Sequence, residues 1–222
     1  MTPALRAVIF DSDGTLVDSE APGLDVVYEL AREAGLTLDR DQAHHRFRGV
    51  RMAEVAAFVA AQVPRRNPSF EAAFTQRVRE AMTVRFQQGL SPMPGAVSLL
   101  QRLQLPFAVA TNGPREKIEL TLRLTGLRAY FDDRVFCAYE VGHFKPHPGL
   151  FLHTAMALGV DPLACAVVED SLPGIEAGVA AGMQVFALLP SHSLPSHLCG
   201  RITCIGSLED LQQLWAPHLA PA

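Results

Sequence analysis

Two aspartates, Asp11 and Asp13, stand two positions apart directly after the apolar run Ala7–Phe10. A short apolar run of this kind predicts a buried strand, and side chains at i and i+2 of a strand lie on the same face. Two unit charges about 4 Å apart repel each other by roughly 4 kcal/mol at an effective dielectric constant near 20. Either a bound cation or a shared proton must offset that repulsion.

Polar residues also follow two later apolar runs of the chain. The run Phe107–Ala110 leads into Thr111-Asn112-Gly113, and the run Ala166–Val168 leads into Glu169-Asp170-Ser171. In an open parallel sheet the carboxyl ends of the strands meet at one edge, and ligands bind there. We therefore expect the polar residues of all three segments to converge on one site.

The acidic residues of this site predict a magnesium ion. They are Asp11, Asp13, Glu169 and Asp170. Carboxylates without a neighbouring His or Cys form a hard oxygen site, which suits Mg²⁺ better than zinc or copper. Because Mg²⁺ held by few carboxylates keeps positions for water and a phosphate oxygen, the pattern indicates a phosphoryl substrate. Thr111, Asn112 and the backbone N–H groups around Gly14 are the expected donors to its remaining oxygens.

The chain has only two lysines among its 19 basic residues. Lys145 stands in the segment HFKPHPGLF, residues 143–151, where Pro146 disfavours helix at the lysine. Its compact ammonium group would neutralise a phosphate and the carboxylates together. Lys117 lies beside Glu116 on a predicted helix, and we interpret it as a surface residue.

The elements that position these residues alternate between strand and helix. Buried strands are predicted at Ala7–Phe10, Phe107–Ala110, Ala164–Val168 and Gln184–Leu189. Helices are predicted over Arg115–Leu124, over Gly149–Leu158 with Gly159 at its C-terminus, and from Pro173-Gly174 to Gly182. This alternation predicts an α/β fold with a doubly wound parallel sheet.

Residues 18–90 follow a different pattern. Helical periodicity appears near 21–34, 40–47, 51–63 and 69–88, with breaks at Gly35 and at 64–68, and no convincing strand. We therefore predict a discontinuous core domain, 1–17 with 91–222, and an inserted all-helical domain, 18–90. The paired links Val17–Glu20 and Gly89–Pro94 are expected to act as a hinge.

The composition of the chain limits the kinds of binding partner that we expect. The 222 residues are 49% hydrophobic, carry a net charge of −4 and have a pI near 6.0, which disfavours nucleic-acid and membrane-surface binding. No apolar run approaches the 18 residues of a membrane span, and no signal-peptide core follows Arg6. Four cysteines without a C-x-x-C motif suit reduced thiols. We expect a cytoplasmic protein and, by default, a monomer.

The order of these motifs resembles one enzyme superfamily. Asp11-Ser12-Asp13-Gly14-Thr15, Thr111-Asn112, Lys145-Pro146 and Glu169-Asp170 are similar, in that order, to the four motifs of the haloacid dehalogenase (HAD) superfamily. The helical insert resembles the α-helical cap of the β-phosphoglucomutase-like subgroup. The resemblance therefore implies a Rossmann-like core with a cap and a hydrolase that acts on phosphate esters.

The resemblance also implies roles for the motif residues. Asp11 would attack phosphorus and become an aspartyl phosphate, while Asp13 would protonate the leaving alcohol and then activate water. Thr111, Asn112 and Lys145 would hold the transferring group. The Mg²⁺ ligands would be Asp11, Asp170 and the main-chain carbonyl of Asp13, with Glu169 as an outer ligand or a neighbour of the metal.

Departures within the superfamily favour a phosphatase. Asp13 argues against dehalogenases and phosphonate hydrolases, and Thr15 is typical of phosphatases rather than mutases. The segment Glu20–Gly23 lacks the histidine that sugar-phosphate mutases tend to carry there, so a mutase of the β-phosphoglucomutase type is the alternative. A phospho-aspartate signalling receiver or binding module is disfavoured, because receivers place their carboxylate pair before the phosphorylated aspartate and lack a helical insert.

The cap should select the substrate. The segment RFRGVRMAEV, residues 46–55, resembles the substrate-facing cap loop of this subgroup, so Arg48, Gly49 and Arg51 are candidate contacts, with a solvated helix face as the other interpretation. Glu20 is either an acceptor for a substrate hydroxyl or a favourable charge at a helix N-terminus. The whole pattern is most similar to bacterial phosphatases of small sugar phosphates, especially the branch that acts on 6-phosphogluconate, whose carboxylate an arginine would bind.

Overall fold

The computed structural model describes residues 4–63, 69–198, 200 and 202–221, and the chain divides into two compact units. One unit comprises residues 1–17 and 91–222, and the other comprises Asp18–Leu90. The predicted break at 64–68 lies outside the described residues.

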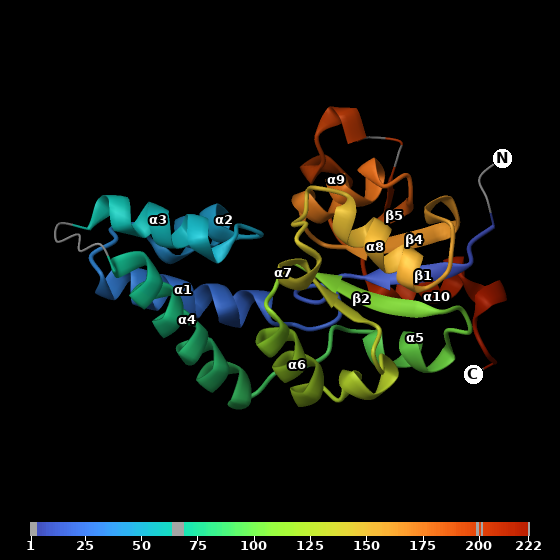
Figure 1. The fold of residues 1–222 in the computed structure, drawn as a ribbon, viewed down its shortest axis with the longest axis horizontal. Helices are drawn as coiled ribbons and strands as arrows, with labels where there is room; N and C mark the ends of the chain where they lie inside the picture. The colour runs from blue at the N-terminus through green and yellow to red at the C-terminus, as the bar shows by residue number, and fades with distance from the viewer. Residues whose placement is uncertain (1–3, 64–68, 199, 201, 222) are drawn as a thin grey trace. The chain divides into compact units, whose positions relative to one another are not determined.

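The first unit is built on a parallel sheet of six strands within the described residues (Figure 1). The strands are β1 (Ala7–Phe10), β2 (Phe107–Thr111), β3 (Val135–Cys137), β4 (Cys165–Glu169), β5 (Gln184–Ala187) and β6 (Ile202–Cys204). Their order is β3-β2-β1-β4-β5-β6, so the order reverses beside β1. In such doubly wound sheets, ligands bind outside the carboxyl ends of the strands at this switch point.

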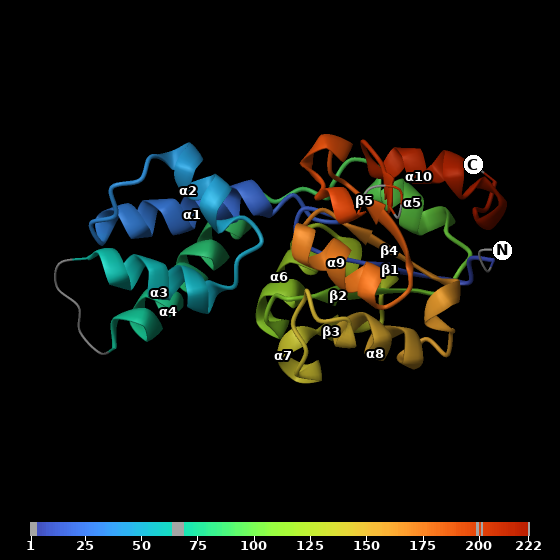
Figure 2. The same cartoon turned by 90° about the horizontal axis from the view of Figure 1, so that it is seen from above.

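Helices cover both faces of the sheet, with α8 and α9 on one face and α5 and α10 on the other (Figure 2). The helices of this unit are α5 (Ala96–Arg102), α6 (Arg115–Leu124), α7 (Ala138–Val141), α8 (Gly149–Ala157), α9 (Leu172–Ala180) and α10 (Leu208–Leu214). Short 3-10 turns occur at Leu127–Tyr130, Pro162–Ala164, Ser191–Ser193, Ser196–Leu198 and Ala216–His218. The predicted doubly wound α/β fold is thus confirmed.

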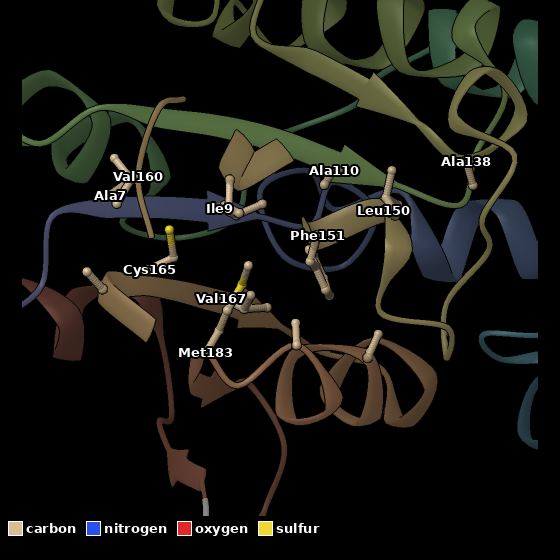
Figure 3. Close-up of a cluster of buried hydrophobic side chains, with 14 residues drawn as sticks. Ala7, Ile9, Ala110, Ala138, Leu150, Phe151, Val160, Cys165, Val167 and Met183 are labelled. Atoms are coloured by element: carbon tan, nitrogen blue, oxygen red, sulfur yellow. The ribbon is translucent and has the colours of Figure 1, made fainter. Parts of the chain in front are cut away.

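Alternating side chains of the buried strands form the core on each face of the sheet. Ala7 and Ile9 of β1 pack with Cys165 and Val167 of β4 against Phe151 of α8 and its neighbours (Figure 3). On the opposite face, Phe10 contacts Phe107 edge-to-face at 6.3 Å between ring centroids, and Phe107 contacts Phe131 in the same way at 5.4 Å. Because both faces are covered, the strands are apolar on both sides.

The second unit is all helical and has its own core. It contains α1 (Glu20–Glu33), α2 (Arg40–Phe47), α3 (Met52–Gln62) and α4 (Phe70–Gln87), each close to its predicted range. Helix α2 begins at a capping box in which Asp39 and Gln42 bind each other's backbone N–H groups. Buried side chains from all four helices, including Val27, Phe47, Val59 and Phe74, form one cluster.

The two links between the units leave the first unit side by side. Val17 pairs with Pro92 in an isolated antiparallel bridge, and the N–H of Met93 donates to the carbonyl of Leu16 at 2.8 Å. Val17 is fully buried, so this exit point is anchored in the core. Whether the links act as a hinge stays a prediction.

Two further sequence interpretations concern the membrane and the thiols. Among the helices that the structure describes, none is both long and apolar enough to cross a membrane. Cys137, Cys165 and Cys204 are free thiols, and Cys199 lies outside the described residues.

Candidate active site

The centre of the site is a buried ammonium group between two carboxylates. Lys145 Nζ lies 2.5 Å from Asp11 Oδ1 and 2.7 Å from Glu169 Oε1. It also lies 4.9 Å from the centre of the Phe151 ring, a favourable cation–π position. The side chain of Lys145 is 2% exposed and that of Glu169 is fully buried, so water screens these interactions little.

Strand periodicity explains why Asp11 and Glu169 meet. Asp11 is two residues after Ile9, and Glu169 is two residues after Val167; Ile9 and Val167 both belong to the cluster under Phe151. Strands β1 and β4 pair with Phe10 opposite Val168, and the N–H of Asp11 donates to the carbonyl of Val168 at 3.0 Å. The period of two and this register place both carboxylates on one face at one level.

Lys145 reaches this position because Asn112 holds its backbone. The N–H of Lys145 donates to Asn112 Oδ1 at 2.9 Å, and Asn112 Nδ2 donates to the carbonyl of Lys145 at 3.2 Å. Asn112 was expected to hold the transferring group, but its side-chain oxygen and nitrogen are already engaged here. It therefore positions Lys145, and the second N–H of its side-chain amide stays a predicted donor to a phosphate oxygen.

Glu169 is held by Ser171 as well as by Lys145. The N–H and the hydroxyl of Ser171 both donate to Glu169 Oε2 at 2.8 Å. A Cβ at Gly174, in the first turn of α9, would overlap the Glu169 carboxylate, so glycine leaves the space that this side chain fills. Both oxygens of Glu169 thus accept hydrogen bonds from the protein, and Oε1 is the one that holds Lys145.

Asp170 approaches the site through Thr15 and Gly14. Thr15 Oγ1 donates to Asp170 Oδ1 at 3.1 Å across 155 residues of sequence. Gly14 has a φ of +80°, and a Cβ there would overlap the Asp170 carboxylate. The tight turn after β1 directs the N–H of Gly14 itself to the carbonyl of Val17 at 2.8 Å, and phosphate binding by the other backbone N–H groups around Gly14 stays a prediction.

Asp13 is paired with the second lysine of the chain. Lys117 Nζ lies 2.7 Å from Asp13 Oδ2, and neither side chain is more than 27% exposed. Interpreting Lys117 as an ordinary surface residue was therefore wrong. Lys117 lies in the first turn of α6, and its side chain runs beside Gly113. A Cβ atom built on Gly113 would lie 3.8 Å from Lys117 Cδ and 3.6 Å from Asp13 Oδ2.

Thr111 completes the polar edge at the end of β2. Its side chain is buried, and its Oγ1 accepts the N–H of Gly113 at 3.0 Å. A hydroxyl that accepts one hydrogen bond still carries its own proton to donate. Thr111 therefore remains suited to contact a phosphate oxygen, as expected from the sequence.

The residues of the site fit a divalent cation. Asp11, Glu169 and Asp170 each offer a carboxylate oxygen within 4.8 Å of the others, and all three are buried. With Lys145 as the neighbouring cation, this cluster retains two negative charges when its acids are ionised. Hard oxygen ligands and this residual charge match Mg²⁺.

The charges of the site also shift the pKa values of its members. Burial raises the pKa of Asp11 to about 7 against the attraction of Lys145, and the nearby charge of Glu169 raises it further. Burial alone would lower the pKa of Lys145, yet the charges of Asp11 and Glu169 raise it above its usual value. Lys145 thus stays charged, while full ionisation of Asp11 near neutral pH requires additional positive charge.

The candidate cap residues lie in the helical unit. Glu20 is the first residue of α1, and its Oε2 lies 2.5 Å from Nη1 of Arg48, which follows α2. Arg51 pairs with Glu54 at the start of α3, and Gly49 is exposed with a φ of +70°. The structure thus joins Glu20 to Arg48 and places Arg51 in a separate ion pair.

Comparisons with known proteins identify the family. Residues 5–182 match the model of the haloacid dehalogenase-like hydrolases. The chain belongs to this family. The superfamily resemblance expected from the sequence is confirmed.

Individual relatives agree with this assignment. The chain is 32% identical over 211 residues to 6-phosphogluconate phosphatase of Escherichia coli, covering 95% of each chain, and 31% identical over 183 residues to hexitol phosphatase B of the same organism, covering 81% and 82%. A HAD family hydrolase from Deinococcus radiodurans, crystallised with phosphate and sodium, superposes with a TM-score of 0.76 at 34% identity over 100% of both chains. The expected enzyme class, a phosphatase of this family, is confirmed.

Proposed function

We propose that this enzyme is a Mg²⁺-dependent phosphatase that hydrolyses a small sugar phosphate, of the 6-phosphogluconate type, through an aspartyl-phosphate intermediate. The observation that carries the proposal is the buried group of Asp11, Lys145, Glu169 and Asp170 at the switch point of the sheet. Its excess of two negative charges suits a divalent cation, and its single ammonium suits a phosphoryl group.

The cation would be held by Asp11, Asp170 and the main-chain carbonyl of Asp13, with Glu169 beside it. When bound, it supplies positive charge to the phosphoryl oxygens and lowers the proton affinity of Asp11. Thr15 fixes Asp170 for this purpose, and Ser171 fixes Glu169.

The first half-reaction transfers the phosphoryl group to the protein. The Asp11 oxygen that Lys145 does not contact attacks phosphorus, and the bond between phosphorus and the sugar oxygen breaks. Asp13 donates its proton to that leaving oxygen, so the sugar departs as an alcohol. Lys145 and Thr111 stabilise the charge of the transferring group.

The second half-reaction returns the enzyme to its starting state. Asp13, now a carboxylate, accepts a proton from water, and the resulting hydroxyl attacks phosphorus. The bond between phosphorus and Asp11 breaks, inorganic phosphate leaves, and Asp11 is free as a carboxylate. General acid catalysis accounts for only about 10²- to 10⁴-fold of the acceleration, so charge stabilisation and positioning must supply most of the rest.

The substrate class rests on two supports. The relatives named above are phosphatases of a phosphorylated sugar acid and of hexitol phosphates by name. In the helical unit, the side chain of Arg48 is 52% exposed and pairs with Glu20, a combination that can bind a substrate carboxylate or hydroxyl. We assign substrate recognition to Glu20, Arg48, Gly49 and Arg51, and expect Arg48→Ala to raise KM for an acidic sugar phosphate.

A screen of phosphorylated metabolites tests the function. Metal-free protein should release no phosphate, Mg²⁺ should restore turnover, and sugar phosphates should be the best substrates. Asp11→Asn should abolish turnover while still unfolding in a single cooperative thermal transition with the metal removed. Robust turnover by Asp11→Asn or by metal-free protein contradicts the proposal.

A second assay separates the phosphatase from the mutase. The protein is incubated with a hexose 1-phosphate and a bisphosphate activator, and both isomer and inorganic phosphate are measured. We expect phosphate release to outpace isomerisation, and the opposite ratio would make the enzyme a mutase.

A further inference from the structure

We propose that Lys117 is a positioning residue for phosphoryl transfer, which holds the Asp13 side chain in place to donate its proton to the leaving group and to accept one from water afterwards. This inference rests on the proposed role of Asp13 and assigns a role to a residue outside the four sequence motifs. The observation behind it is the 2.7 Å contact between Lys117 Nζ and Asp13 Oδ2, made across 104 residues of sequence.

The Asp13 carboxylate is held by a different cation from the carboxylates of Asp11 and Glu169. Asp11 is fixed by the buried ammonium of Lys145, and Glu169 by Lys145 and two groups of Ser171. The Asp13 side chain is instead 25% exposed and lies in the turn after β1. Lys117 gives its carboxylate a charge-assisted hydrogen bond, which is shorter and stronger than a neutral one.

Helix α6 makes this support rigid. Lys117 lies in the first turn of α6, and its backbone N–H donates to the carbonyl of Pro114 at 3.1 Å. Ile118, Thr121 and Leu122 of the same helix are buried, so α6 is anchored in the core of the first unit. The same segment that carries Thr111 therefore carries the group that orients Asp13.

Lysine usage agrees with a specific role. Most basic residues of the chain are arginines, and the two lysines contact the two aspartates of the first motif: Lys145 contacts Asp11, and Lys117 contacts Asp13. A compact ammonium can approach one carboxylate oxygen closely and leave the other free, whereas the planar guanidinium favours binding both. The ammonium of Lys117 thus holds Asp13 through its Oδ2 atom alone.

This role predicts that the effect of removing the Lys117 ammonium on catalysis depends on the leaving group of the substrate. A sugar alkoxide is a poor leaving group that needs the Asp13 proton, whereas p-nitrophenolate leaves without it. The measured quantity is kcat/KM, since it reports the steps up to transfer of the phosphoryl group to Asp11 and is independent of the later hydrolysis.

The experiment uses the full chain with Mg²⁺ and two substrates, the best sugar phosphate of the screen and p-nitrophenyl phosphate. Lys117→Met should lower kcat/KM for the sugar phosphate about 10- to 100-fold, and for p-nitrophenyl phosphate less than about threefold. Lys117→Arg should recover part of the loss. Arg123→Met, which removes the same charge from an exposed position of α6, should leave both values unchanged.

A double-mutant cycle checks that the effect passes through Asp13. In an Asp13→Asn background, Lys117→Met should cause no further loss with the sugar phosphate. Equal losses on both substrates, no loss on either, or a full additional loss in the Asp13→Asn background would overturn the inference. If the wild-type chain turns over neither substrate, the proposed phosphatase function itself fails. If the wild type is active and only the Lys117 variants behave differently from expectation, the role of Lys117 alone fails.

Discussion

Asn112 holds the backbone of Lys145 with the oxygen and the nitrogen of its side chain, accepting the Lys145 N–H at 2.9 Å and donating to its carbonyl at 3.2 Å. These bonds join the end of β2 to the loop that carries the central cation. The position of Lys145 therefore depends on a residue that acts on its backbone and not on its ammonium group.

Replacing Asn112 should impair the site through Lys145. In Asn112→Ala the Lys145 N–H and carbonyl lose these partners, so we expect the free energy of unfolding to fall by about 1–3 kcal/mol. Phosphatase activity should fall tenfold or more, since the ammonium is no longer held. Urea denaturation and steady-state kinetics measure the two effects. Gln88→Ala, at an exposed position of the helical unit, is the control, and an Asn112→Ala enzyme with full activity would refute this dependence.

Stabilisation by Mg²⁺ should increase with pH. Because the pKa of Asp11 is raised to about 7 in the metal-free site, Asp11 is largely protonated below pH 7 and must lose that proton when a cation binds. The apparent Mg²⁺ affinity should therefore fall as pH drops through 7, by up to about tenfold per pH unit for one displaced proton. The rise in Tm on adding Mg²⁺ should be larger at pH 8 than at pH 6.

The raised pKa of Asp11 also determines whether the stability of the metal-free protein rises or falls with pH. The folded state binds more protons than the unfolded state between the ordinary pKa of an aspartate, near 4, and about 7. The contribution of Asp11 to stability is therefore present at acid pH and lost as pH rises through 7. Asp11→Asn should remove this slope, and an unchanged slope in Asp11→Asn would assign it to another group.

Replacing either of two serines beside acidic motif residues with alanine should change the free energy of unfolding differently. Ser12 Oγ is buried and has no hydrogen-bond partner among the described residues, whereas Ser171 Oγ donates to Glu169 and accepts the Gly174 N–H. Ser12→Ala should leave the free energy of unfolding unchanged or raise it by about 1 kcal/mol, because an unpaired polar atom is removed. Ser171→Ala should lower it by about 1 kcal/mol and reduce activity. Chemical denaturation of both variants compares them, and equal losses would contradict the assignment.

Glycine at position 174 should be required for the placement of Glu169. Gly174→Ala adds a methyl group into the space of the fully buried Glu169 carboxylate, which must then move away from Lys145. We expect a loss of about 1–3 kcal/mol in stability, the usual effect of overpacking, together with a marked loss of activity. Gly23→Ala is the matched control, because the added methyl group in α1 makes only ordinary contacts, 3.4 Å from Met82 Cε. That variant should be neutral or stabilised by about 0.5–1 kcal/mol, and equal effects of the two changes would count against the role of Gly174.

The positions of the strand ends were predictable because short apolar runs have few alternatives. Ala7–Phe10 is a strand over the predicted range, and the runs before Thr111 and Glu169 differ from prediction by one residue. The rule that parallel strands share one edge places Asp11 and Glu169 at the same edge, and the pairing of β1 with β4 then brings them together. The edge strands β3 and β6 were not predicted, since three residues are too few to show a period.

The roles of individual polar atoms could not be predicted in the same way. Gly14 looked like a phosphate donor, but its N–H closes a turn on Val17, and its missing Cβ makes room for Asp170. Lys117 looked like a solvated lysine beside Glu116, although its rarity in an arginine-rich chain was a usable signal. Such choices depend on where α6 and the turn after β1 meet, which short-range sequence patterns do not specify.

The central place of β1 in the sheet also affects how the protein is made. During synthesis Asp11 emerges before its counter-ion Lys145, which follows 134 residues later, and the Thr15–Asp170 contact spans 155 residues. The helical unit is continuous in sequence and can form from local contacts first. The apolar strand Ala7–Phe10 stays unpaired on the nascent chain until its partners β2 and β4 have been synthesised. We therefore expect this segment to need protection from aggregation until translation has passed β4.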